Sequence, residues 1–380
     1  MRKPFLISSI MKITNGFFLS SKIFCMKELK SLFVLVIFSI LFFSMGERIN
    51  VAAQTIITVG EGATDMPSIE DAFDQLPENC GETIIRLNKS VDGDPIVSLS
   101  IPINKGITSL TIENSDLENS IVIETISEIF ANGIPFILGE KVSLPNGWVF
   151  GGSKAENGKI RNVKGTSITI LGSSAYAFGG GAALNGGRSF VSGQTSVVLG
   201  RQGKIFWEIF GGGYAAGVDS ISEVSKTSLS IFGTADYVLG GGLAKENGRV
   251  VVSESTSVTI ESGGTAAIGS FGGGNAVGQG SISETKMASS IIYGAAVWAF
   301  GGDFTYQGGQ SFLTGTADIT VAEGAHVKSL YGGSFATDMN SYSEVNQSVV
   351  HIKGTAESAV PEGETSYGGI SVVKNATSIQ

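Results

Sequence analysis

Hydrophobic and polar positions alternate in short runs through much of the chain, and in the second half the same run returns at a nearly fixed spacing. Each run carries two apolar positions separated by a polar one, as in Thr227-Ser228-Leu229-Ser230-Ile231. Because successive side chains of a strand point to opposite faces, each run predicts a β-strand with one apolar face. The runs begin at Thr195, Thr227, Thr256, Ala288, Ala317 and Ser348.

Aligning these runs produces two columns of mostly apolar residues. The first column holds Val197, Leu229, Val258, Ser290, Ile319 and Val350, and the second holds Leu199, Ile231, Ile260, Ile292, Val321 and Ile352. Columns of this kind are expected when parallel strands stack coil on coil with one face turned inward.

An aromatic residue or leucine followed by glycines marks the same period. It occurs at Phe150, Phe178, Phe210, Leu239, Phe271, Phe300 and Tyr331, with a late echo at Tyr367. Successive members of this series lie about 30 residues apart, and a fixed period of this size indicates a repeat architecture, here of about ten coils. We therefore predict an all-β fold, a parallel β-helix (β-solenoid), for which the family resemblance described below implies a right-handed coil.

Residues 54–149 are less regular than the rest. Ile69, Ala72, Phe73 and Leu76 lie at i, i+3, i+4 and i+7, which predicts a short amphipathic helix before a series of short strands. A helix in this place is typical of a cap on the open end of a solenoid. We predict an N-terminal cap and the first coils over residues 54–149, and the glycine-rich repeat solenoid over residues 150–380.

The first residues resemble a targeting segment. Residues 31–45 are apolar, follow Lys27 and Lys30, and precede the small residues Ala52 and Ala53. This pattern predicts a secretory signal peptide within a leader of residues 1–53, with Met26 as an alternative start. A membrane anchor is the alternative, but this apolar segment is shorter than the ~20 residues that span a bilayer. We expect a secreted or cell-surface protein with no membrane span in the mature chain.

Composition and charge limit the partners. The chain has 53 Gly, 8 Pro and 42% hydrophobic residues, which favours many strands joined by glycine turns over a disordered linker. The leader holds seven basic and two acidic residues, so its removal changes the net charge from −9 to −14 (−9 minus +5). That charge disfavours nucleic acid and anionic membranes as partners. Cys80 is the single cysteine of the mature chain, so no internal disulfide is expected.

A second period, twice as long as the first, overlies it. Tyr176, Tyr237 and Trp298 recur in every second repeat, two positions before the aromatic column, and Trp148 has the same register. Polar or small residues (Glu208, Gly269, Ser329) take this position in the other coils, so we expect it to face solvent and to offer rings to a glycan or a protein partner. Shielding of a sheet edge is the alternative. The sequence also leaves open whether the true repeat is one coil of ~30 residues or a pair of such coils.

The aromatic column itself permits two interpretations. Facing inward, the rings would form a stacked core in which each contributes ~1.5–3 kcal/mol. Facing outward, they would form a hydrophobic strip for sugar rings or a partner protein. The glycines after them are expected at a corner that needs either positive φ or close approach of backbones.

The strand Thr256-Ser257-Val258-Thr259-Ile260, followed by small residues and then Phe-Gly-Gly-Gly at 271–274, resembles the glycine-rich repeats of bacterial adhesin-like surface proteins. Those repeats are similar to pectin-lyase-like right-handed β-helices. The resemblance covers residues 150–369 and implies a structural or binding protein at the cell surface, with extracellular polysaccharide or a host or cell-surface protein as partner. The alternative that it allows is a polysaccharide lyase or glycoside hydrolase, since one fold hosts many activities.

Few residues offer catalytic chemistry. The chain has two His, so neither a standard zinc site nor a cofactor site is expected. Repeated carboxylates at Glu223, Glu284 and Glu344 would lie ~9–10 Å apart, two coils from one another. That separation exceeds the ~5–5.5 Å of a retaining glycosidase pair and reaches the upper end of the inverting range. We therefore expect solvated surface carboxylates, no catalytic residue, and a binding protein in preference to an enzyme.

Overall fold

The computed structural model describes residues 54–91, 97–116, 118–376 and 379, which belong to one compact unit, Ala52–Gln380. The leader predicted at residues 1–53 lies outside them. None of the helices among the described residues is long and apolar enough to cross a membrane. The described ranges include two short helices, α3 (Ile69–Asp74) and the 3-10 helix η1 (Ile103–Lys105). The Oγ of Ser68 accepts a hydrogen bond from the N–H of Asp71 at the start of α3, and α3 buries Ile69, Ala72 and Phe73.

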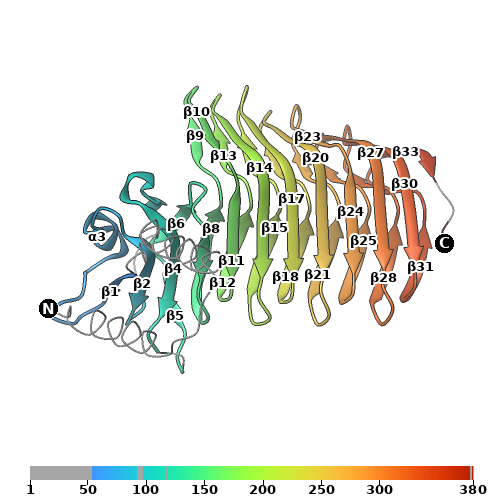
Figure 1. Ribbon diagram of the computed structural model, residues 1–380. Helices are drawn as coiled ribbons and strands as arrows, with labels where there is room; N and C mark the ends of the chain where they lie inside the picture. The colour runs from blue at the N-terminus through green and yellow to red at the C-terminus, as the bar shows by residue number, and fades with distance from the viewer. Residues whose placement is uncertain (1–53, 92–96, 117, 377–378, 380) are drawn as a thin grey trace, which may run out of the picture. The chain divides into compact units, whose positions relative to one another are not determined.

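The rest of the described chain is a parallel β-solenoid of about 11 turns, built from three sheets whose strands from successive coils lie side by side (Figure 1). The all-β solenoid prediction is confirmed. The first sheet, which we call the spanning sheet, has 14 strands. They are β1 (Thr55–Val59), β2 (Gly81–Leu87), β4 (Ile107–Asn114), β7 (Phe136–Leu138), β10 (Ile160–Val163), β11 (Thr166–Ile170), β14 (Arg188–Leu199), β17 (Ile221–Ile231), β20 (Arg249–Ile260), β23 (Ile282–Thr285), β24 (Ala288–Ile292), β27 (Gln310–Val321), β30 (Tyr342–Ile352) and β33 (Ile370–Ala376).

Two smaller sheets oppose the spanning sheet. The lobe sheet has 11 strands: β3 (Val97–Ser100), β5 (Ile121–Val122), β6 (Ile126–Phe130), β8 (Val142–Phe150), β12 (Ser173–Phe178), β15 (Lys204–Phe210), β18 (Thr234–Leu239), β21 (Thr265–Phe271), β25 (Ala295–Phe300), β28 (His326–Tyr331) and β31 (Thr355–Val360). The arm sheet has eight: β9 (Lys154–Glu156), β13 (Ala182–Leu184), β16 (Tyr214–Ala216), β19 (Leu243–Lys245), β22 (Asn275–Val277), β26 (Phe304–Tyr306), β29 (Phe335–Thr337) and β32 (Glu364–Ser366).

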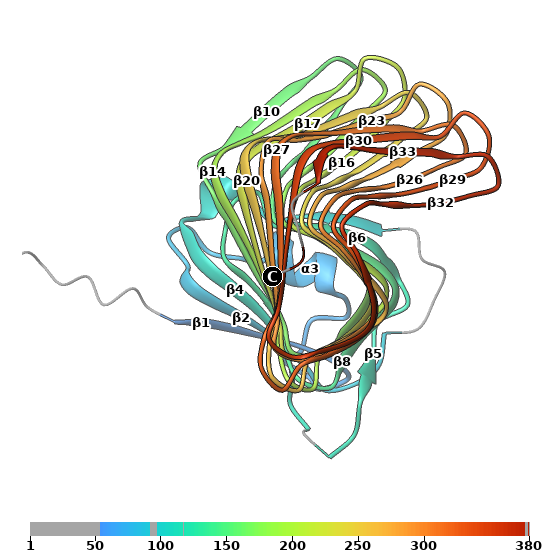
Figure 2. The same ribbon diagram turned by 90° about the vertical axis from the view of Figure 1, so that its right-hand side faces the viewer.

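The solenoid has two parts in cross-section (Figure 2). The C-terminal halves of the long spanning strands and the lobe sheet enclose a closed core, which we call the core lobe. The N-terminal halves of those strands and the arm sheet form a narrow extension, which we call the arm. Each coil from β9 to β32 adds one strand to the lobe sheet and one to the arm sheet, so the single coil is the structural unit.

The two apolar columns predicted from the sequence are the inner ladder of the core lobe. Leu229 pairs with Val197 and Val258, and Ile231 pairs with Leu199 and Ile260, in the expected register. These side chains are at most 1% exposed. The predicted strand register is confirmed, and burial of each such side chain is worth ~1.5–3 kcal/mol.

The glycine runs form the waist between the core lobe and the arm. Gly179, Gly180 and Gly181 all have ordinary φ values, so positive φ is not the reason for them. A Cβ on Gly180 would lie 2.7 Å from the backbone N of Gly213 in the next coil. The hydroxyl of Thr195 donates to the carbonyl of Gly211 at 2.6 Å across the same waist. Close approach of backbones therefore requires glycine here.

Candidate functional site

The aromatic column is buried, but it lies outside the core lobe. Phe178 and Phe210 stack with ring centroids 4.8 Å apart and an angle of 4°. Ala177, one residue earlier, packs into the core lobe, so Phe178 points to the other face of the lobe sheet. The exposed-strip interpretation is therefore wrong. Burial of this face is possible because the arm sheet turns back against the lobe sheet at the waist.

A second layer of rings covers the aromatic column where the lobe sheet meets the arm sheet. Trp148 lies 5.6 Å from Phe178, Phe304 lies 5.3 Å from Phe271, and Phe335 lies 5.6 Å from Phe300. We call the column and this layer the aromatic corner. Its partly buried members are Trp148, Tyr176, Tyr214, Tyr237, Phe304, Tyr306, Tyr331 and Phe335.

The residues predicted as a binding row do share one register on the lobe sheet. Trp148 pairs with Tyr176, Tyr176 with Glu208, and Glu208 with Tyr237. The row continues through Gly269 and Trp298 to Ser329. Trp298 is 37% exposed, whereas Trp148, Tyr176 and Tyr237 are partly buried among the rings of the corner.

The absence of a side chain at Gly269, within this row, has a steric reason. A Cβ there would lie 3.0 Å from Cε2 of Phe271 and 3.4 Å from Cδ1 of Tyr237. The Tyr237 ring therefore leans toward the position that lacks a side chain. A side chain at position 269 would therefore crowd the rings of Phe271 and Tyr237.

The most unusual group in the aromatic corner is the carboxyl of Glu208. Burial raises its pKa to about 7, although the charge of Lys245 and a hydrogen bond with Asn275 oppose that rise. Asn275 is 1% exposed, and its Oδ1 has no hydrogen-bond partner among the described residues. Burial and the charge of Glu208 raise the pKa of Tyr176 to about 12, so its phenol stays protonated at neutral pH. The corner therefore combines aromatic faces with a carboxyl group that titrates near neutral pH.

The sequence pattern shows Glu208 only as a polar residue between aromatic positions, and it does not reveal Asn275 or Lys245. These two belong to β22 and β19, strands of three residues that are too short to give an alternating pattern. Trp207, which is 57% exposed beside Glu208, was also missed. It lies where the register of β15 shifts relative to its neighbours, so counting back from Phe210 does not find it.

The repeated carboxylates lie elsewhere, on the outer face of the arm. Glu223 pairs with Phe190 and Val251, so acidic and apolar residues alternate from coil to coil. Glu284 forms a two-point ion pair with Arg249, at 3.1 and 2.6 Å. Glu344 accepts a hydrogen bond from the hydroxyl of Tyr342 at 2.8 Å and pairs with Lys374. Because coils with an acidic residue at this position alternate with coils that have an apolar one, carboxylates of like charge lie two coils apart. These carboxylates face neither each other nor the aromatic corner.

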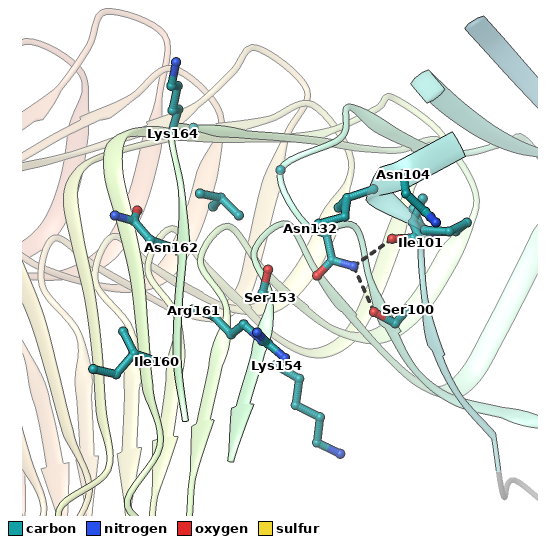
Figure 3. A pocket seen from close by; sticks show the side chains of 15 residues that line it. Ser100, Ile101, Asn104, Asn132, Ser153, Lys154, Ile160, Arg161, Asn162 and Lys164 are labelled. Atoms are coloured by element: carbon teal, nitrogen blue, oxygen red, sulfur yellow. Dashed lines mark hydrogen bonds between the residues drawn. The ribbon is translucent and has the colours of Figure 1, made fainter. Parts of the chain in front are cut away.

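A pocket of about 720 Å³ lies beside the first strand of the arm in the spanning sheet, β10 (Figure 3). Asn132 Nδ2 donates to Ser100 Oγ and to the carbonyl of Ile101, both at 2.8 Å, on one side of it. Lys154, Arg161 and Lys164 line the pocket and no acidic residue does, although Lys154 pairs with Glu128 at 3.2 Å. The pocket is therefore locally basic on an acidic chain, and it can accommodate an anionic group.

Cys80 is buried and unpaired. Within the described ranges, no three His, Cys, Asp or Glu side chains gather as metal ligands. No protein-family model, no curated protein and no solved structure matches the chain.

Proposed function

We propose that this chain is a secreted or cell-surface, adhesin-like protein that binds an extended glycan along its aromatic corner. A right-handed coil, with α3 covering the first coil, is part of the proposal and follows from the resemblance to adhesin-like and pectin-lyase-like β-helices. The observation that carries the proposal is the row of Tyr176, Tyr237 and Trp298, which places rings in alternate coils of one rigid sheet.

The spacing and exposure of these rings suit a carbohydrate chain. Two coils separate successive rings, so they lie ~9–10 Å apart along the solenoid. Aromatic faces supply stacking area and lose little rotamer entropy on binding. Each of these rings packs against another aromatic ring, Tyr176 on Trp148, Tyr237 on Phe304 and Trp298 on Phe335. The free protein therefore already holds them in place, which lowers the entropy cost of binding further.

Catalysis on the same scaffold has less support. A glycosidase needs two carboxyl groups within ~5–9.5 Å. In the row that holds Glu208, the next carboxylate is Glu128, three coils away and therefore roughly 14 Å distant. The phenol of Tyr176, with its pKa raised to about 12, stays protonated at neutral pH and so is not available there as a general base. The geometry favours binding without cleavage.

The test is a double variant, Tyr237→Ala with Trp298→Ala, in the purified mature chain. We expect loss of binding on a glycan array while the melting temperature falls by only a few degrees, because both rings are partly exposed. Tyr293→Ala with Tyr367→Ala is the matched control, since those rings are 47% and 84% exposed outside the corner. Equal binding by wild type and the corner variant, or depolymerisation of a glycan by wild type, would overturn the proposal.

A further inference from the structure

We infer that Glu208, Asn275 and Lys245 form a polar subsite in the aromatic corner that binds two neighbouring hydroxyl groups of a neutral sugar ring. The inference rests on the proposed function and names the class of sugar.

The position of Glu208 in the row is the first argument. Between Trp148 and Trp298 the row reads Trp148, Tyr176, Glu208, Tyr237, Gly269 and Trp298, so Glu208 is its single charged residue. One coil, or ~4.8 Å, separates it from the ring on either side. A sugar ring stacked on Tyr176 or Tyr237 would bring its hydroxyl groups to the level of this carboxyl.

The residue opposite Glu208 is the second argument. At two places in the row the arm sheet faces a ring with a ring of its own: Trp148 faces Tyr214 at 5.4 Å, and Tyr237 faces Phe304 at 6.3 Å. Opposite Glu208 it presents Asn275 instead, and a hydrogen bond joins the two side chains. The polar pair therefore spans the corner as the aromatic pairs do.

The unpartnered oxygen of Asn275 is the third argument. This side chain is 1% exposed, and its Oδ1 accepts no hydrogen bond from the described residues. A buried polar atom without a partner is unfavourable and rare in native proteins. A sugar hydroxyl at the carboxyl of Glu208 would donate to this oxygen only if the corner opens locally, because the oxygen is inaccessible in the free protein; such opening would give the oxygen its missing partner.

The charges of Glu208 and Lys245 favour neutral over acidic sugars at this subsite. Glu208 as a carboxylate accepts hydrogen bonds from two sugar hydroxyls, and the ammonium of Lys245, close enough to affect the Glu208 carboxyl, donates to a sugar oxygen. The carboxylate of an acidic sugar would meet Glu208 at close range and be repelled. Tyr176, Tyr237 and Tyr306 also face Glu208, and burial raises the pKa of each, so these phenols remain neutral.

Protonation of Glu208 should then control the affinity. Its carboxyl is largely neutral at pH 6 and largely charged at pH 8, because its pKa is about 7. A protonated carboxyl accepts fewer hydrogen bonds from hydroxyl groups than a carboxylate does. Binding of a neutral sugar is therefore expected to strengthen from pH 6 to pH 8.

The experiment compares wild type, Glu208→Gln, the corner variant lacking the Tyr237 and Trp298 rings, and the Tyr293/Tyr367 control. Isothermal titration at pH 6 and pH 8 uses neutral hexasaccharides of several linkages and an oligogalacturonide of the same length. We expect wild type and control to prefer neutral chains, and Glu208→Gln to bind them about tenfold or more weakly with no pH dependence. Lys245→Met serves as a second variant if Glu208→Gln does not fold.

The outcomes separate the two proposals. Loss of binding in the corner variant, with wild-type affinity in Glu208→Gln, would overturn the subsite and leave the glycan-binding corner in place. Preference of wild type for the oligogalacturonide would overturn the assignment to neutral sugars. Absence of binding to every glycan would overturn both proposals.

Discussion

The core lobe and the arm are built by the same coils, yet they have opposite interiors. Long aliphatic side chains fill the core lobe, with Leu199, Ile231 and Ile260 fully buried in one ladder. The arm interior is thin and holds small residues, among them Ala183, Ala215 and Ala244. The core lobe therefore supplies most of the hydrophobic stabilisation, since that term scales with apolar area. The arm contributes the surface that closes the aromatic corner.

The waist and the arm also hold buried polar groups. Asp303, which takes the third position of a glycine run at the waist, is fully buried, with Oδ1 accepting a hydrogen bond from the N–H of Gly274 at 2.7 Å. Its Oδ2 and the hydroxyls of Ser283, Thr285 and Thr305 have no hydrogen-bond partner within the described part of the chain. Such groups lower stability. One repeat can therefore combine a stabilising core with a less stable part that positions a binding surface.

The largest expected effect comes from the core lobe. Replacing Ile231 by Ala should lower the free energy of unfolding by about 2–5 kcal/mol, because it leaves a cavity between Leu199 and Ile260. Val224→Ala in the arm, also buried at 1% exposed, should cost about 1.5 kcal/mol. Urea unfolding of the two variants measures the difference. A larger loss for Val224→Ala would show that the arm, and not the core lobe, dominates stability.

The second prediction concerns Asp303, whose pKa burial raises from 3.8 to about 7. The folded protein holds this proton more tightly than the unfolded chain, so stability is greatest below pH 4 for this group and is lost as pH rises to 7. Asp303→Asn should remove this dependence of stability on pH and raise the free energy of unfolding at pH 8 by up to about 4 kcal/mol. Glu208, with a pKa of about 7, should leave a smaller decrease of stability with rising pH in this variant.

Thermal unfolding between pH 4 and pH 8 tests this expectation. A variant that is destabilised equally across the whole range would show that the carboxylate of Asp303 serves the arm as a hydrogen-bond acceptor in its charged form.

The waist gives the third and smallest effect. Gly180→Ala should cost about 1–3 kcal/mol, because the new methyl group meets the backbone of Gly213, which has no room to move. Gly165→Ala is the matched control: it also has an ordinary φ, and its nearest neighbour is the carbonyl of Gln194 at 3.2 Å. Hydrogen exchange of the arm strands measures the loss locally. Equal protection in both variants would mean that the waist does not hold the arm in place.

The core lobe could be predicted from the sequence and the arm could not, for physical reasons. Leu229 and Ile231 alternate with Ser230 in long strands buried on one face, so period and register are both visible. The arm strands have three residues each, and their middle residue (Ala183, Ala215, Ala244) is too small to reveal burial. The pairing of Glu208 with Asn275 joins residues two coils apart, and only the closing of the arm sheet on the lobe sheet brings them together.

The aromatic column shows the same limit. Its seven members were visible in the sequence, but their inward or outward orientation depended on a second sheet that the sequence did not reveal. Phe178 faces away from the core lobe and is still 0% exposed, because Trp148 and Tyr214 cover it. A column on the outer face of a sheet becomes a second core once the arm lies over it.

A crystal structure of the mature chain with a bound neutral hexasaccharide tests the central claim most directly. We expect sugar rings stacked on Tyr237 and on its neighbours in the row, with two hydroxyl groups of one ring on the carboxyl of Glu208. A sugar bound in the basic pocket beside β10, or on the outer face of the arm near Glu284, would contradict it.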